Sequence, residues 1–244
     1  MKKLLLLASL IVLSTNISCA QGWRNSKRIT GNKDLTSTTR SVGEYNAVSV
    51  YGPMDVELVA GNEGTLKIEA ESNLIEYITT QVEGGNLKIA IERGVNLQAS
   101  RNMSIKITVP FKDIEAVRLT GSGDIWNTDV IKSQEFQVEV TGSGDITLDL
   151  KADTVIGGIT GSGDITFKGD TNRLKCSVKG SGDFKAFNLN ANDVKASVTG
   201  SGDIEIMATQ ELKASVSGSG DITYKGNPEK QDFKTSGSGS VSKG

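Results

Sequence analysis

The chain has 244 residues, a formal net charge of −2, 28 glycines and no histidine. This length is enough for one or two domains with a hydrophobic core. The lack of a basic tract argues against nucleic-acid binding, and the lack of histidine excludes Ser-His and Cys-His nucleophile pairs and every His-ligated metal site.

Residues 1–20 have the pattern of a secretory signal peptide. Two lysines precede an apolar run from Leu4 to Leu13, and small or polar residues follow it. Cleavage after Ala20 would leave a mature chain that begins at Gln21; the alternative is a lipoprotein acylated on Cys19. Both forms predict an exported protein in the periplasm, on the outer-membrane surface or outside the cell, with membrane contact only through the lipid.

Residues 21–41 are polar and lack periodicity, which predicts an N-terminal tether. Between 42 and 113, apolar and polar residues alternate in short segments, which predicts an irregular β part. The expected strands are Tyr45–Tyr51, Met54–Val59, Thr65–Ala70, Thr79–Val82, Asn86–Ile91 and Ser104–Val109. One helical turn is expected at Asn73–Ile78, with Asn73 or Ser72 as its cap.

A tetrapeptide, Gly-Ser-Gly-Asp, recurs through the rest of the chain. Its copies begin at Gly121, Gly142, Gly161, Gly180, Gly200 and Gly218, and a seventh copy with Ser in place of Asp begins at Gly237. The steps between copies are 18 to 21 residues, a period that is typical of repeat architectures. Apolar residues occupy every second position on both sides of the tetrapeptide, so each copy is expected to be a turn between two half-buried strands.

These repeats predict an all-β fold in which residues 114–244 form a right-handed, parallel β-helix-like solenoid. It would have about seven turns of the coil, or rungs, of ~19 residues each, stacked ~4.8 Å apart so that like residues lie above like. The alternative is an antiparallel meander with the Gly-rich turns as hairpin loops. Residues Tyr51–Val56 match the repeat in register, which predicts a degenerate early rung and an N-terminal part that shares the geometry of the coil.

The aspartates of the turns should form a row along the coil. They are Asp124, Asp145, Asp164, Asp183, Asp203 and Asp221. Neighbours ~4.8 Å apart repel by roughly 1 kcal/mol at the dielectric constant of water, so something must offset the repulsion. The favoured explanation is that each carboxylate accepts backbone N–H groups of its own turn; the alternative is Ca²⁺ bridging successive rungs, and no other cofactor is expected.

Two surface features are candidates for binding. An outward row just before the turn contains Thr120, Thr141, Thr160 and Thr199, with Lys179 and Ser217 completing it. A flat row of this kind can bind an ordered ligand or glycan, although it is also ordinary strand surface. Trp126 should point outward beside Ile125, where it could stack on a sugar ring or pack at the rim. Cys176 falls in an apolar column and is expected to be a buried, unreactive thiol.

The order of these segments resembles a known family. A signal peptide, a Val-x-Val-x-Gly-x-x-Asp-Val-x-Leu segment from Val48 to Leu58, and serial Gly-Ser-Gly-Asp-Ile repeats are similar to the exported head GIN domain family. That family is described as putative autotransporter adhesin and is common in Bacteroidetes. The resemblance covers residues 42–244 and implies a β-solenoid-like fold, a cell-envelope or extracellular location and an adhesive function without catalytic residues.

The sequence therefore predicts an exported, non-enzymatic adhesin or binding module that presents a repetitive face to a glycan or protein at the cell envelope. The alternative is a structural coil that self-assembles, and the sequence leaves the oligomeric state open. A polysaccharide-active enzyme is a third hypothesis, since some β-helix enzymes use acidic residues. Equal rungs, however, provide no asymmetric catalytic constellation.

Overall fold

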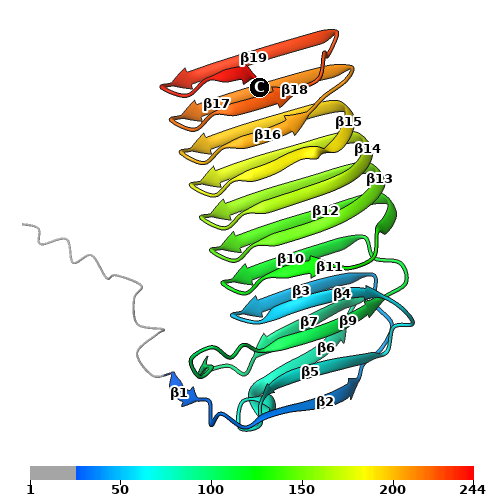
Figure 1. The fold of residues 1–244 in the computed structure, drawn as a ribbon, viewed down its shortest axis with the longest axis vertical. Helices are drawn as coiled ribbons and strands as arrows, with labels where there is room; N and C mark the ends of the chain where they lie inside the picture. The colour runs from blue at the N-terminus through cyan, green and yellow to red at the C-terminus, as the bar shows by residue number, and fades with distance from the viewer. Residues whose placement is uncertain (1–25) are drawn as a thin grey trace, which may run out of the picture.

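The computed structural model describes residues 26–244, which form one continuous stack of strands (Figure 1). The predicted signal peptide and Cys19 lie outside the described residues. Successive repeats pair in parallel and in register, first Gly on first Gly, from Gly121 to Gly237. This confirms the predicted parallel solenoid and excludes the meander, whose neighbouring strands would be antiparallel.

Each rung has two faces that meet at the Gly-Ser-Gly-Asp turn. The strands that lead into the turn are β3 (Ala47–Gly52), β10 (Ala116–Gly121), β17 (Glu211–Gly218), β19 (Lys230–Gly237) and the C-terminal part of β12 (Ile131–Gly142). The strands that follow it are β4 (Asp55–Ala60), β11 (Ile125–Asn127), β16 (Ile204–Met207), β18 (Ile222–Lys225) and β20 (Val241–Lys243). We call the outer surfaces of these two sets the pre-turn face and the post-turn face.

Three long strands join the two faces at the corner opposite the turn. They are β13 (Ile146–Gly161), β14 (Ile165–Gly180) and β15 (Phe184–Gly200). Each begins just after one turn on the post-turn side, bends, and reaches the next turn on the pre-turn side (Figure 1). Their register is continuous through the bend except for one bulge between β14 and β15, so both faces are held to the same stacking order.

Columns of apolar side chains fill the coil. The column two residues before the turn consists of Val50, Leu119, Val140, Ile159, Val178, Val198 and Val216, all buried. The column that begins the post-turn strands consists of Val56, Ile125, Ile146, Ile165, Phe184, Ile204 and Ile222, also buried. Burial of each such side chain contributes about 1.5–3 kcal/mol to the free energy of folding. Because the side chains of one rung are buried against those of the next, each rung stabilises its neighbours.

One glycine within the core makes room for an aromatic pair. Phe167 and Phe184 stack edge to face, with ring centroids 5.3 Å apart. A Cβ at Gly157 would lie only 2.5 Å from the Phe184 ring. On the neighbouring rungs the column of Gly157 holds Val138 and Cys176, so the missing side chain compensates for the larger ring.

The predicted early rung is confirmed. Gly52 of β3 lies in register with Gly121, and Val56 of β4 lies in register with Ile125. The chain then leaves the coil, forms the N-terminal end of the stack, and returns at β10 directly above β3. Strands β7 (Asn86–Ile91) and β9 (Lys106–Phe111) pair in parallel beneath β3 and β4, so this segment does continue the geometry of the coil.

Antiparallel strands close this end of the stack. Strand β6 (Ile78–Glu83) pairs with β7, and β5 (Thr65–Glu71) pairs with β9 and with β2 (Leu35–Ser41). The change from parallel to antiparallel pairing interrupts the repeat. Figure 1 shows β2 and β5 beyond β9, at the N-terminal end of the stack. The strand edge that the coil would otherwise expose is thereby covered.

The structure differs from the tether predicted for residues 21–41. Within the described part of this segment, β2 joins the main sheet, and β1 (Lys27–Thr30) pairs in parallel with β8 (Val95–Gln98), a strand that the sequence analysis also missed. Most side chains of β1 and β2 are exposed. Backbone hydrogen bonds hold these strands in place. Because their side chains are mostly exposed, their sequence shows no alternation of apolar and polar residues, and this alternation is the signal from which the other strands were predicted.

The predicted helical turn is confirmed as the 3₁₀ helix η2 (Ile75–Tyr77), but its predicted caps are wrong. The N-cap is Leu74, which makes no side-chain capping bond. The side chains of Ser72 and Asn73 instead bond to the segment before β2: Asn32 donates to Ser72 Oγ at 2.8 Å, and Asn73 donates to the Thr30 carbonyl at 2.8 Å. These bonds hold the polar segment between β1 and β2 against the residues that join β5 to η2.

A buried carboxylate holds the same region together. Glu71 is 1% exposed, and it accepts hydrogen bonds from the Lys33 amide at 2.5 Å, the Ser100 amide at 2.7 Å and the Ser100 hydroxyl at 2.6 Å. Desolvation raises the pKa of Glu71, but these hydrogen bonds lower it by more, so the net pKa lies below its ordinary value. Glu71 thus joins three segments that are distant in the sequence.

We expect Cys176 to react slowly with thiol reagents in the folded protein. Its side chain is 3% exposed, and burial raises the pKa of the thiol, so little thiolate is present at neutral pH. Labelling with a chromogenic disulfide should be slow in buffer and fast in denaturant. Fast labelling in buffer, with the far-UV spectrum of a folded β protein retained, would contradict the buried position.

Candidate functional site

The Gly-Ser-Gly-Asp turns stack directly on one another through their backbones. The carbonyl of Gly142 accepts N–H groups from both Ser162 at 2.8 Å and Gly163 at 3.1 Å of the rung above, and the other copies repeat this pair of bonds. The first Gly of each copy has a positive φ, +130° for Gly161. The turn is therefore a rigid corner, and the side chains on either side of it are held at fixed positions.

The predicted role of the aspartates needs a correction. Each carboxylate accepts an N–H group from the next rung and not from its own turn: the amide of Asp164 donates to Asp145 at 2.8 Å, and the amide of Asp183 donates to Asp164 at 2.8 Å. The same bond recurs at Asp124, Asp183, Asp203 and Asp221, and Asp55 of the early rung begins the series. The row is therefore a ladder that links the rungs.

This ladder offsets the repulsion between the carboxylates. A backbone N–H points at one oxygen of each Asp, and hydrogen bonds to a charged group contribute about 1.5–3 kcal/mol. Lys185 adds a cation within the row, 2.6 Å from Asp164 and 3.7 Å from Asp183. Ser240 replaces Asp in the last copy and donates both its amide and its hydroxyl to Asp221.

We expect the melting temperature to be the same in EDTA and in millimolar calcium. One oxygen of each aspartate already accepts a backbone amide, and within residues 26–244 no group of three or more acidic or Cys side chains is arranged to hold a metal ion. Differential scanning calorimetry in the two buffers tests this. An increase of several degrees in calcium would support the alternative of Ca²⁺ bridging between rungs.

The predicted threonine row lies on the pre-turn face and is exposed along its length. Thr120, Thr141 and Thr160 are in register on successive rungs, followed by Lys179, Thr199 and Ser217. Tyr51 of the early rung, 39% exposed, lies beside Thr120. The structure therefore brings these residues together as one straight column that runs across the strands.

Trp126 lies on the other side of the turn. It belongs to the post-turn face, in register with Glu57 and Thr147, and it is half-buried. The Lys106 amine lies over its ring, 5.5 Å from the centroid, and forms an ion pair with Glu57 at 2.9 Å. Trp126 therefore lies within the post-turn face, on a strand that is paired on both sides, and does not extend the threonine row.

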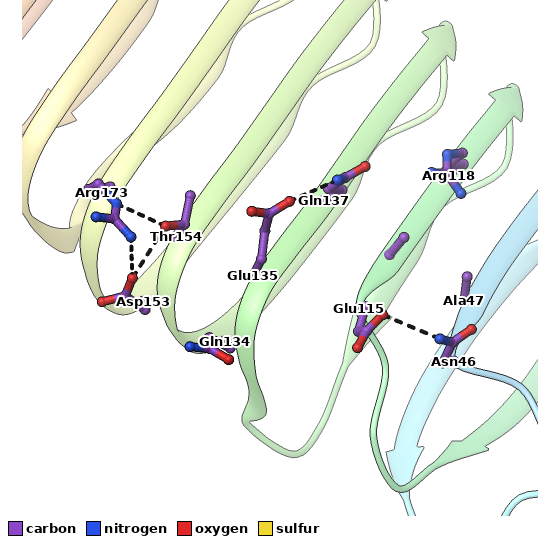
Figure 2. A pocket seen from close by; sticks show the side chains of 11 residues that line it. Asn46, Ala47, Glu115, Arg118, Gln134, Glu135, Gln137, Asp153, Thr154 and Arg173 are labelled. Carbon is purple, nitrogen blue, oxygen red and sulfur yellow. Dashed lines mark hydrogen bonds and ion pairs between the residues drawn. The ribbon is translucent and has the colours of Figure 1, made fainter.

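A polar hollow, which the sequence analysis missed, lies on the pre-turn face near the bend (Figure 2). Its volume is about 580 Å³, and side chains from five rungs line it. The polar lining residues are Asn46, Glu115, Arg118, Gln134, Glu135, Gln137, Asp153, Thr154 and Arg173. The small side chains of Ala47 and Ala116 form part of the same lining; three of the later rungs carry lysine in the same column.

Hydrogen bonds orient the side chains of this hollow. Asn46 donates to Glu115 at 3.3 Å, and Gln137 donates to Glu135 at 3.1 Å. Arg173 bonds to Asp153 and to the Thr154 hydroxyl, as Figure 2 shows. The Asn172 hydrogen bond and the Arg173 charge lower the pKa of Asp153. The result is an open array of paired donors and acceptors of both charges.

A second ladder of polar side chains occupies the bend itself. Asn172 donates to Asp153 at 2.6 Å, Asn192 donates to Asn172 at 3.1 Å, and Thr209 donates to Asn192 at 3.0 Å. Such stacked amide ladders stabilise parallel sheets whose rungs are in register. Asp153, Asn172 and Asn192 lie eight residues before Gly161, Gly180 and Gly200, and this recurrence is the sequence signal that could have revealed the ladder.

Comparison with known proteins places this geometry in a family. The family model described as putative auto-transporter adhesin, head GIN domain, matches residues 44–228, which include the early rung, the hollow and six of the repeat turns. The chain belongs to this family. The match confirms the resemblance seen in the sequence, and none of the curated proteins is a significant match. No described helix of this head GIN domain is long and apolar enough to span a membrane.

Solved structures share the fold. A putative adhesin from Bacteroides fragilis is 25% identical, with a TM-score of 0.80, and the match covers 88% of this chain and 99% of that one. A putative lipid binding protein from Parabacteroides distasonis is 27% identical, with a TM-score of 0.73 and coverage of 89% and 100%. A putative adhesin from Parabacteroides merdae is 21% identical, with a TM-score of 0.70, and the match covers 90% of this chain and 100% of that one.

Proposed function

We propose that this head GIN domain is an exported, non-enzymatic adhesin that binds a glycan or protein at the cell envelope through its pre-turn face. The observation that supports this most is the straight, exposed column of hydroxyl groups beside the polar hollow on that face. The name of the family and the name of the Bacteroides fragilis neighbour, a putative adhesin, agree with adhesion. The predicted signal peptide supports export.

The regularity of the pre-turn face suits an extended ligand. Rungs are spaced ~4.8 Å apart, so the three successive rungs that carry Thr120, Thr141 and Thr160 offer the same hydroxyl group to successive units of a ligand that lies across the strands. Single contacts of this kind are weak, but several in a row bind with a much higher effective affinity. The stacked turns hold the column rigid, which reduces the entropy that is lost on binding.

The hollow adds groups that suit a sugar. Amide, carboxylate and guanidinium side chains converge there from separate rungs, and sugar hydroxyls can both donate to and accept from such groups. Asp153 in this hollow does not suit the role of general acid in glycoside hydrolysis. A general acid needs a raised pKa, whereas Asn172 and Arg173 lower the pKa of Asp153. This favours binding over catalysis.

We expect the chain from Gln21 to Gly244 to bind specific members of a glycan and matrix-protein array, and we expect Thr141→Ala combined with Thr160→Ala to weaken that binding about tenfold. The two threonines lie side by side in the centre of the column, and loss of one net hydrogen bond costs about 0.5–1.5 kcal/mol each. Trp126→Ala is the matched control, because Trp126 lies on the post-turn face. Biolayer interferometry measures both.

Two outcomes would contradict the proposal. Loss of binding in the Trp126 variant but not in the threonine variant would move the site to the post-turn face. A blank array with folded protein, together with oligomers that grow with concentration in light scattering, would favour the self-assembling coil. Strand β19 would then be the first surface to test, because it pairs with β17 alone among the described strands and all its residues are exposed.

A further inference from the structure

A column of lysines runs along the C-terminal half of the pre-turn face. Lys175, Lys195 and Lys213 lie in register on successive rungs, five residues before each turn, and all three are exposed. The corresponding positions are Ala116, Gln137 and Ile156 on the earlier rungs and Asp232 on the last rung. The lysine column therefore belongs to one half of the face only, which a general solubility requirement does not explain.

The surrounding charges make this half of the face strongly positive. From Arg173 onward, its outward residues include seven cations, Arg173, Lys175, Lys179, Lys195, Lys213, Lys230 and Lys234. They include three carboxylates, Asp193, Glu211 and Asp232. Arg173, Lys213 and Lys234 are ion-paired with Asp153, Glu211 and Asp232, which leaves Lys175, Lys179, Lys195 and Lys230 without a described carboxylate within 4.0 Å. The chain as a whole has a net charge of −2, so the positive charge is concentrated here. Such a concentration attracts anions over distances of several ångströms.

The lysine column lacks the internal compensation that the aspartate row has. Each aspartate of the ladder accepts an N–H group from the next rung, whereas Lys175 and Lys195 have no described carboxylate within 4.0 Å of their amines. Only Lys213 forms an ion pair, with Glu211. The repulsion between neighbouring amines is therefore left for solvent ions or a bound anion to offset.

Beside the lysines runs a shallow groove with a floor of hydroxyl groups. Ser177, Ser197 and Ser215 are half-buried and in register, and Ser215 donates to Ser197 at 3.1 Å. The lysine column forms one wall, and the exposed column of Lys179, Thr199 and Ser217 forms the other. A hollow of about 280 Å³ opens in this groove, lined by Lys195, Ala196, Lys213, Ala214, Ser215, Asp232 and Lys234.

We propose that this groove binds a linear acidic polysaccharide, which lies along the axis of the coil with its carboxylates facing the lysine column and its hydroxyls facing the serine floor. The proposal rests on the proposed function and names the class of glycan that the pre-turn face takes. Amines repeated along one line match a ligand whose charges are also repeated along a line. The hydroxyl floor distinguishes a sugar from other polyanions, since sugar hydroxyls can bond to it.

Binding of polygalacturonate to the chain from Gln21 to Gly244 tests this inference, with neutral dextran as the uncharged comparison. The triple variant Lys175→Gln, Lys195→Gln, Lys213→Gln should lower the affinity about 30- to 100-fold, by analogy with charges that act on an anionic surface. The matched control, Lys132→Gln, Lys168→Gln, Lys225→Gln, removes the same charge outside the groove and should change the affinity less than threefold, or about 0.6 kcal/mol. The melting temperatures of both variants verify their folding.

Each other outcome overturns the inference. Equal loss in both triple variants would mean that only net charge matters, and equal affinity for duplex DNA or for vesicles of anionic lipid would mean that the groove does not recognise a sugar. Binding of neutral glycans alone, sensitive to the threonine variant, would leave the proposed function intact and exclude this groove. Absence of any glycan or protein ligand would instead count against the proposed function itself.

Discussion

Replacing Gly163 by Ala should lower the free energy of unfolding by about 3 kcal/mol or more. A Cβ at this position would lie 2.1 Å from the carbonyl oxygen of Gly144 on the rung below and 3.0 Å from a methyl group of Val140. The clash is with backbone, which cannot move aside as a flexible side chain can. The second Gly of every copy faces the same close contact, about 2 Å, with the rung beneath it.

Urea unfolding of Gly163→Ala against Ser162→Ala measures this effect. Ser162 is the neighbouring residue of the same turn, and its side chain is exposed, so its replacement should change stability by less than about 0.5 kcal/mol. Gly163 does not have a positive φ, which separates the effect of space from that of backbone conformation. Equal stability of the two variants would show that the rungs can separate at the turn without loss.

Replacing Glu71 by Gln should cost about 2–3 kcal/mol at pH 7. The carboxylate accepts three hydrogen bonds in a buried position, and Gln would turn an NH₂ group toward at least one of those donors. Lys33, whose φ is +65°, would lose the bond that holds it in this conformation. The segment around Lys33 should therefore be held less firmly against β5.

The effect of this substitution should depend on pH. The folded-state pKa of Glu71 is lowered, so its contribution is fully present above the unfolded-state pKa of about 4.3 and is lost as the pH falls through the folded-state value. The difference between the wild type and Glu71→Gln should therefore shrink between pH 7 and pH 3. Glu69→Gln, a more exposed residue of the same strand, is the control. A difference that stays constant with pH would contradict the assignment.

The sequence by itself determined the repeat, the parallel register and the core of the coil. In a solenoid, each rung meets only its neighbours, so one column of residues in space is one recurring position in the chain, and its chemistry is visible without long-range information. For this reason Gly52 and Val56 could be aligned with the later repeats although Pro and Met replace part of the turn. The outward threonine row and the buried position of Cys176 follow from the same alternation.

Only the tertiary structure decided how the polar groups are used. An Asp in a Gly-rich turn can accept a hydrogen bond from a backbone N–H of its own turn or of the next rung. Both arrangements need an Asp at the same place in the repeat, so the sequence cannot distinguish them. In the stacked coil, the amide of the next rung lies within hydrogen-bond distance of the carboxylate. Strands β1 and β2 are held by backbone bonds that leave no pattern of side chains. Glu71, Lys33 and Ser100 are brought together by the antiparallel pair β2–β5 and the separate parallel pair β1–β8, both outside the repeat, so no periodicity could have predicted their meeting.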